Sequence, residues 1–159
     1  MTDRQRTDVL DSTDRQLLEE LQRDARAPLT ALASAIHLGV SATRVRLQSL
    51  EERQVITGYS AKVDVAAYGF ALRAMVRMKV HGSLYDKVTE VLARQPQIVR
   101  CMRVTGESCY VMEILAIDMA DLESITTDLA RVGSITTDLV YEVVVDRAIA
   151  SPVATASPV

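Results

Sequence analysis

The spacing of apolar residues changes once along the chain, near Gly58, and this change limits the folds that the chain can adopt. Before it, residues 12–54 carry apolar side chains three and four positions apart, which is the period of amphipathic helices. After it, residues 71–81 alternate strictly, with an apolar side chain at every second position from Leu72 to Val80. A period of two over this length is typical of a half-buried β-strand. The chain is therefore expected to be neither all-helical nor all-β.

Three short helices are expected in the first segment. Ser12 or Thr13 can cap the first helix, and Pro28 suits the start of the second. A tight turn at residues 37–39 precedes a third helix over residues 40–54. The apolar residues at helical spacing, which we expect to form the core of this segment, are Leu17, Leu18, Leu21, Leu29, Leu32, Ala33, Ile36, Val40, Leu47 and Leu50.

The second segment is expected to fold in the order β-α-β-β-α-β, which is the ferredoxin-like arrangement. The six elements are predicted over residues 71–81, 83–95, 98–104, 109–117, 119–132 and 135–145. A hairpin that turns at Gly106 would pair Cys101 with a residue near Met112. The last strand has apolar side chains on both faces, so we expect a partner subunit to cover the sheet face that the helices leave open.

The composition excludes several classes of protein. The chain of 159 residues has a formal net charge of −3 and only two cysteines, too few for a disulfide scaffold. It has no apolar run approaching the ~20 residues of a membrane helix. His37 and His81 lie in different segments, without a nucleophile or metal ligand at a recognised spacing, so we expect neither an enzyme nor a metal site. These features predict a reduced, cytoplasmic protein.

The charge distribution in the first segment points to nucleic acid. Residues 25–50 contain Arg26, Arg44 and Arg46 and no acidic residue, whereas the rest of the first 59 residues holds five arginines and nine acidic residues. A surface that faces phosphate must lack carboxylates, because carboxylates repel the duplex. The same stretch has the composition of a helix-turn-helix. Three-helix units of this size also dock on proteins, which is the alternative.

Three separated motifs resemble those of the leucine-responsive regulatory protein/AsnC family. Residues 10–26 (LDSTDRQLLEELQRDAR) resemble the opening of the family's DNA-binding domain, and residues 50–59 (LEERQVITGY) resemble the end of its recognition helix. Residues 104–110 (VTGESCY) resemble its glycine-centred loop. The resemblance implies a transcriptional regulator that binds double-stranded DNA. It also implies that the protein forms dimers and possibly octamers, and responds to a small effector, typically an amino acid.

The resemblance also implies an α+β fold. An N-terminal three-helix winged-type helix-turn-helix would be followed by a ferredoxin-like βαββαβ domain of the RAM/ACT type. The boundaries that we expect are a helix-turn-helix domain over residues 1–59, a linker strand over 60–70, a ligand-binding and oligomerisation domain over 71–147, and a flexible tail over 148–159.

The residues that read DNA depend on the register of the third helix. An ungapped alignment places Gly39 where the family usually has a capping serine, and Arg44 where it has a buried aliphatic residue. A shift that makes Ser41 the cap leaves the third helix two residues short. Under either register the residues expected to contact DNA are Arg26, Ser41, Thr43, Arg44, Arg46 and Gln48, with Ser41 and Thr43 touching phosphate. For Arg44 the alternative is a solvated helix charge.

The loop around Gly106 is the effector site that the resemblance implies. Its backbone N–H groups and the Ser108 hydroxyl are suited to a carboxylate, and the alternative is that Gly106 only makes a turn. Cys109 replaces an aspartate that is frequent in the family, so Glu107 or Asp138 would have to balance the effector's ammonium group. The expected effector-binding residues are Val104, Thr105, Gly106, Glu107, Ser108, Cys109, Thr137 and Asp138. We expect no cofactor besides such an amino acid. The alternative function is an amino-acid-sensing interaction protein whose helical half docks on another protein.

Overall fold

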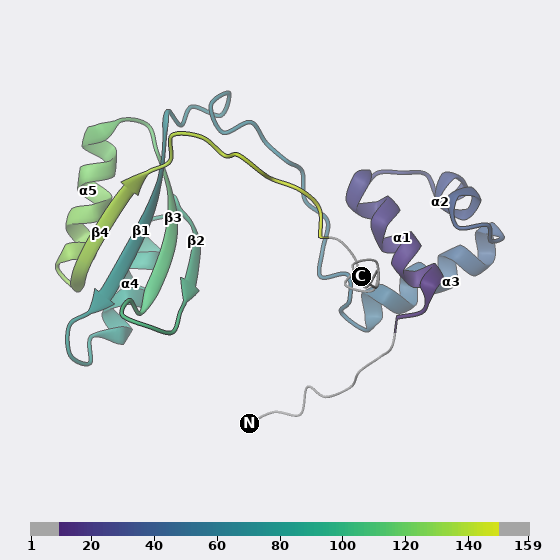
Figure 1. The fold of residues 1–159 in the computed structure, drawn as a ribbon, viewed down its shortest axis with the longest axis horizontal. Coiled ribbons are helices and arrows are strands. Elements are labelled where there is room, and N and C mark those ends of the chain that lie inside the picture. Colours follow the sequence, from purple (N-terminus) through teal and green to yellow (C-terminus); the bar gives the residue numbers. More distant parts are fainter. Residues whose placement is uncertain (1–9, 150–159) are drawn as a thin grey trace, which may run out of the picture. The chain divides into compact units, whose positions relative to one another are not determined.

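The structure is a computed structural model that describes residues 10–149 (Figure 1). It divides into two compact units. The first, here called the helical head, combines the chain up to Ala61 with the segment from Val145, and the second, here called the sheet unit, is Lys62–Val144. Each unit has its own hydrophobic core. The α+β fold is therefore confirmed, with the helical part first.

The helical head contains α1 (Ser12–Arg23), α2 (Leu29–Ala35) and α3 (Val40–Glu52) in its described part. Six of the residues expected in its core are buried: Leu17, Leu21, Leu32, Ala33, Ile36 and Leu50. Val40 is instead 41% exposed at the first position of α3. Residues 10–61 form no strand, so the wing that the resemblance implied is absent from the described head.

The start of α1 differs from the prediction, because the cap is Asp11 rather than Ser12 or Thr13. Asp11 Oδ1 accepts a hydrogen bond of 2.7 Å from the Asp14 N–H, and Asp14 Oδ2 accepts one of 3.4 Å from the Asp11 N–H. Such a reciprocal capping box satisfies two backbone donors that a helix start leaves unpaired.

The register of α3 is the ungapped one. Gly39 is the N-cap, in an extended conformation and without a side-chain hydrogen bond, and the shift to Ser41 is wrong. The helix ends at Glu52, two residues earlier than expected, because Gln54 adopts a left-handed backbone with φ 57°.

The end of the described chain belongs to the head. Ile149 donates its N–H to Gln22 Oε1 at 2.9 Å, and its carbonyl accepts from Gln22 Nε2 at 3.2 Å. The expected flexible tail thus begins beside α1, and its residues 150–159 lie outside the described chain. Residues 60–70, where we expected a linker strand, form no strand, and a turn occupies residues 65–69.

The sheet unit has the predicted order of elements. These are β1 (Leu72–Val80), α4 (Tyr85–Arg94), β2 (Ile98–Arg103), β3 (Tyr110–Ala116), α5 (Met119–Ala130) and β4 (Gly133–Leu139). In the described chain the strands form one antiparallel sheet in the order β2-β3-β1-β4. The register of the β2–β3 hairpin pairs Cys101 with Met112, as predicted.

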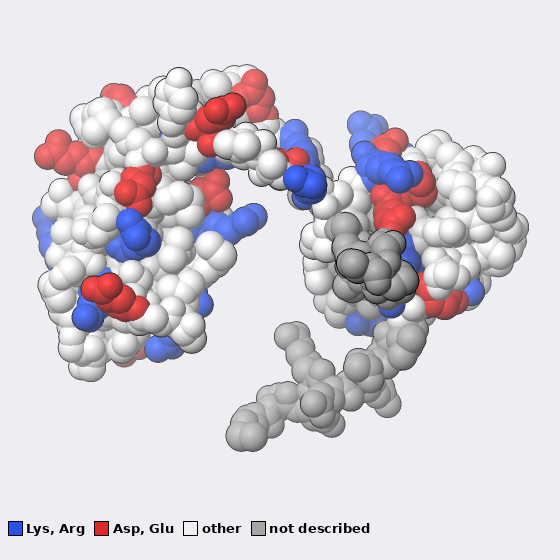
Figure 2. Space-filling view, viewed as in Figure 1, with Lys and Arg blue, Asp and Glu red and all other residues white. Residues whose placement is uncertain are grey.

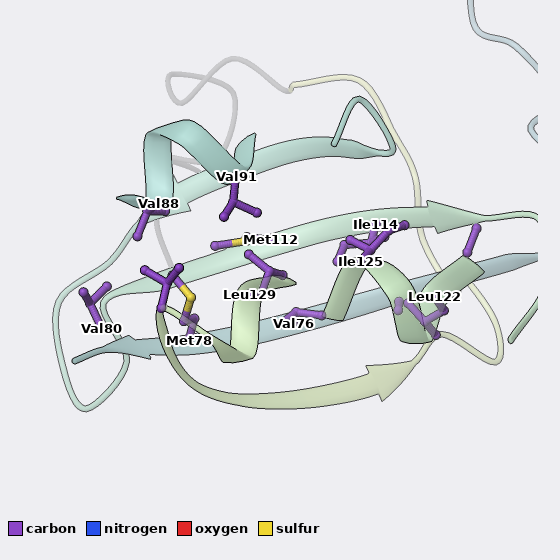
Figure 3. Close-up of a cluster of buried hydrophobic side chains, with 13 residues drawn as sticks. Val76, Met78, Val80, Val88, Val91, Met112, Ile114, Leu122, Ile125 and Leu129 are labelled. Carbon is purple, nitrogen blue, oxygen red and sulfur yellow. The ribbon is translucent and has the colours of Figure 1, made fainter. Parts of the chain in front are cut away.

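Both helices of the sheet unit cover the same face of the sheet (Figure 1), and the core lies between them and the strands (Figure 3). From β1 it receives Val76 and Met78, which are fully buried, as the strict alternation predicted. From the helices it receives Val88 and Val91 of α4 and, among others, Leu129 of α5. The opposite face of the sheet carries no helix in the described chain.

The last strand is shorter than predicted. Its pairing with β1 ends at Leu139, and one further hydrogen bond of 2.8 Å joins the Val140 N–H to the Arg73 carbonyl. β1 begins at Leu72, so the chain beyond Val140 has no neighbouring strand to pair with. The apolar residues that we placed on the end of this strand are therefore exposed: Tyr141, Val143, Val144 and Val145.

A membrane-spanning role finds no support in the helices, since none between residues 10 and 149 is long and apolar enough to cross a bilayer.

Candidate nucleic-acid interface and effector loop

The surface of α3 that points away from the head's core is formed by Ser41, Arg44, Val45 and Gln48, here called the outer stripe. All four side chains are exposed. Their spacing of three, four and seven positions from Ser41 places them on one face of a helix. The core contacts of α3 come from the opposite face, through Leu50 and the half-buried Leu47. The outer stripe is thus the part of α3 that can enter a groove of DNA.

Thr43 does not lie on this surface. Its side chain is fully buried, and its hydroxyl donates a hydrogen bond of 3.0 Å to the Gly39 carbonyl one turn earlier. The prediction that Thr43 touches phosphate is therefore wrong, because the side chain points into the head.

Arg46 likewise differs from its expected role. Its Nη1 atom lies 2.7 Å from Asp11 Oδ2 and 2.7 Å from Asp14 Oδ1. These are the two carboxylates that cap α1, so one guanidinium joins α3 to the start of α1. The two negative carboxylates offset the positive potential around Arg46, so its guanidinium attracts a phosphate only weakly. We predicted that Arg46 contacts DNA, but in the structure its guanidinium instead braces α3 against the start of α1.

The protonation equilibria of this ion-pair cluster reflect its geometry. The pKa of Asp11 lies below its ordinary value, chiefly because the carboxylate accepts the Asp14 N–H and in addition because of Arg46. The pKa of Arg46 is raised, first by its hydrogen bonds to Asp11 and Asp14. Both pKa shifts favour the charged forms of Asp11 and Arg46.

A second contact holds the other end of α3. The Tyr59 hydroxyl donates a hydrogen bond of 2.8 Å to Glu51 Oε1. Partial burial and then the neighbouring Glu51 carboxylate raise the pKa of Tyr59 to about 12, so the phenol stays protonated and remains a donor. The chain that leaves α3 is thus tied back to the helix.

The free charges of the head differ from the bound ones. Arg44 and Arg26 are exposed, and neither side chain makes an ion pair with a described residue. Figure 2 shows a broad surface without charged side chains over α2. These features agree with the acid-free stretch of residues 25–50.

The effector loop, residues 104–109, connects β2 to β3. Gly106 has φ 112°, a backbone conformation that favours glycine. The loop is closed at its base by a hydrogen bond of 3.0 Å from the Val104 N–H to the Cys109 carbonyl. The N–H groups of residues 105–108 donate to no other group of the described chain. These donors are free to hold an anion, as is the hydroxyl of the half-buried Ser108.

Thr137 and Asp138 are not brought to this loop within one chain. They lie on β4, and β1 separates β4 from β3. Asp138 pairs with Arg77 at 2.9 Å on the sheet face that the helices leave open. Of the two carboxylates considered for an effector's ammonium group, only Glu107 belongs to the loop itself, where it is exposed.

Cys109 faces an aromatic neighbour rather than a charge. Its Sγ atom lies 3.9 Å from the Tyr85 hydroxyl, and its N–H donates to the Met78 carbonyl at 2.8 Å. The Arg103 guanidinium lies 4.9 Å from the centre of the Tyr85 ring. Cys101, the other free thiol, is half-buried, and burial raises its pKa.

Comparisons with known proteins agree with both halves of the fold. Residues 10–51 match the AsnC-type helix-turn-helix domain, and residues 73–149 match the Lrp/AsnC ligand binding domain. LrpA of Mycobacterium tuberculosis, an HTH-type transcriptional regulator, is 35% identical over 119 residues, which are 74% of this chain and 79% of that protein. The chain belongs to the Lrp/AsnC family. FL11 of Pyrococcus horikoshii, also an HTH-type regulator, is 31% identical over 72% of this chain and 76% of that protein. The chain is accordingly a DNA-binding transcriptional regulator.

Solved structures of Lrp/AsnC proteins have the same fold. The feast or famine regulatory protein of M. tuberculosis, solved in complex with L-methionine, has a TM-score of 0.80 and 30% identity, covering 86% of this chain and 95% of that one. LrpC of Bacillus subtilis has a TM-score of 0.82 over 87% of this chain and 99% of that one. At 24% identity, this second likeness concerns the fold alone.

Substitutions of Arg44 and Arg46 test which of the two arginines stabilises the head of this Lrp/AsnC regulator. Arg46→Ala leaves the Asp14 side chain, which is 9% exposed, without its cationic partner. We expect the free energy of unfolding of the head to fall by about 1–3 kcal/mol. Arg44→Ala removes an exposed charge and should change it by less than about 0.5 kcal/mol. Urea unfolding followed by far-UV circular dichroism measures both, and equal stability of the two variants would contradict the bracing role.

Acid should weaken the head through Asp11. Because the pKa of Asp11 is lower in the folded chain, its ionised form stabilises the fold above the ordinary pKa, and this stabilisation is lost as the pH falls through the lowered pKa. Asp11→Asn keeps a capping oxygen but not the charge. We expect this variant to be less stable at pH 7 and to lose less stability between about pH 5 and pH 2. A loss of stability in Asp11→Asn over this pH range equal to that of the wild type would contradict the role of Asp11.

Proposed function

We propose that this regulator reads the major groove of DNA with the outer stripe of α3, as a dimer whose sheet units bind an amino acid. The observation that carries the proposal is that the polar side chains of α3 have different surroundings. Arg46 is paired within the head, whereas Arg44 and Gln48 are exposed and turned away from the core. Arginine and glutamine side chains hydrogen-bond to guanine and adenine edges, respectively, in the major groove.

The proposed contacts with the backbone of DNA come from two places. Ser41 lies in the first turn of α3, where N–H groups and a hydroxyl suit a phosphate oxygen. Arg26 lies between α1 and α2, and its backbone is held by a hydrogen bond of 2.8 Å from its N–H to Asp24 Oδ1. Ser41 lies well inside the acid-free stretch, so a phosphate there meets little repulsion, whereas Arg26 has the Asp24 carboxylate beside it.

Dimerisation is supported by the sheet face that carries no helix. On this face the half-buried Met75 of β1 lies beside two ion pairs, Arg73 with Glu113 at 3.4 Å and Arg77 with Asp138. The apolar run after β4 is a second exposed feature, since Tyr141 is fully exposed and Val144 is 83% exposed. Exposed apolar side chains grouped in this way are typical of subunit interfaces. Two copies would also present two outer stripes to a pseudo-palindrome.

An amino-acid effector is supported by the free N–H groups of the effector loop and by a relative. The M. tuberculosis protein with 30% identity was solved with L-methionine. We propose that the loop from Val104 to Cys109 holds the effector's carboxylate, and that Glu107, or Asp138 of another copy, meets its ammonium group. Thr137 would then contribute from that other copy as well.

The rival function is docking of the head on another protein, and a catalytic role is not part of either proposal. The dependence of binding on salt concentration distinguishes DNA binding from protein docking. Binding to DNA weakens steeply with salt, with a slope of roughly 0.9 in log K per phosphate neutralised, whereas protein docking has no such requirement.

DNA binding and its response to amino acids are measured together by fluorescence anisotropy on the DNA upstream of the protein's own gene. We expect one member of an amino-acid panel that includes L-methionine to shift the dissociation constant about tenfold, which is about 1.4 kcal/mol of coupling.

Ser108→Ala should reduce the shift without weakening DNA binding in the absence of effector. Arg44→Ala should weaken specific binding by about 1–3 kcal/mol and relax the specificity at one base position. The matched control is Arg94→Ala, an exposed arginine at the end of α4, which should do neither.

The oligomer is tested in the full chain by light scattering after gel filtration. Tyr141→Asp and Val144→Asp should shift the wild-type dimer towards monomer, because they bring a charge into the interface. Neither side chain is buried in the single chain, so its fold should persist. Ile117→Asp, at a side chain that is 60% exposed after β3, is the control and should leave the mass unchanged. A monomeric wild type would contradict the dimer.

A further inference from the structure

The outer stripe of α3 contains one residue that cannot make a hydrogen bond through its side chain. Val45 is 66% exposed, next to Arg44 and one turn before Gln48. It contributes nothing to the head's interior, because it belongs neither to the buried core nor to the partly buried residues packed against it. A β-branched residue is also slightly unfavourable in a helix.

The position of Val45 on α3 is fixed from both sides. Arg46, the next residue, is held by Asp11 and Asp14, each at 2.7 Å. Thr43, two residues earlier, is fully buried, and Leu50 is buried a turn and a half later. A helix held at these three points cannot rotate to bury Val45, so its two methyl groups face outwards with the hydrogen-bonding ends of Arg44 and Gln48.

The major groove offers one apolar group at its base edges, the C5-methyl group of thymine. A side chain of the size of valine on the groove-facing side of a recognition helix can pack against this methyl group. We propose that Val45 is a specificity-determining residue that selects a thymine by contact with its methyl group. The inference rests on the proposed function, and it adds to it the chemistry of one base position in each half-site.

This inference is tested with the full-length protein and a random-sequence duplex pool. Duplexes selected by the wild type are resynthesised with deoxyuridine in place of one thymine at a time, which removes only the C5-methyl group. We expect one position in each half-site where this change weakens binding about fourfold, the value of one buried methyl group. At that position Val45→Ala, which removes two methyl groups and leaves a shorter side chain, should reduce the difference between the thymine and the deoxyuridine duplexes.

The matched control is Val63→Ala, because Val63 is 59% exposed but lies in the sheet unit, outside α3. This variant should keep the fourfold difference. The inference is overturned if deoxyuridine is tolerated at every thymine, or if Val45→Ala keeps the wild-type difference, which would make Val45 an ordinary exposed valine. Selection of no duplex at all overturns the proposed function together with the inference, and is therefore distinguishable from failure of the inference alone.

Discussion

The pairing of Arg46 with Asp11 and Asp14 holds the reading helix of this regulator in place. The head has few fully buried residues, and those of α3 are confined to Thr43 and Leu50. So small an apolar contact leaves a helix free to turn, whereas a guanidinium placed between two carboxylates defines its rotation. The same carboxylates cap α1, so the brace unites the start of one helix with the middle of another. Everything proposed for DNA recognition depends on that rotation.

The sheet unit is organised by a different constraint. Its helices satisfy one face of the sheet and leave the other with a mixture of apolar side chains and ion pairs. The proposed dimer would cover this face with the same face of a second copy. The effector loop lies at the end of the β2–β3 hairpin, and the N–H groups of residues 105–108 make no hydrogen bond with the described chain. In the proposed function, effector binding would use N–H groups that the fold of a single chain leaves without a protein partner.

Patterns of long range in the sequence predicted the structure well. The alternation from Leu72 to Val80, the order of elements and the pairing of Cys101 with Met112 are all confirmed. The predictions that were wrong concerned single side chains for which the sequence allowed more than one partner. Arginine at position 46 looks the same in sequence whether it faces phosphate or carboxylate, and periodicity alone did not show that Thr43 would turn inwards. The spacing of Asp11 and Asp14 was a readable sign of the capping box, whereas the exposure of Val45 depends on the rotation of α3. The roles of the effector-loop residues stay predictions.

The hydrogen bonds between Gln22 and Ile149 mean that the helical head is discontinuous in sequence, since the chain passes out to the sheet unit and returns. The chain therefore crosses between the two units twice, once after Ala61 and once before Val145. A fragment that stops at residue 61 would lack Ile149, so the Gln22 side chain would lose both of its hydrogen bonds to that residue.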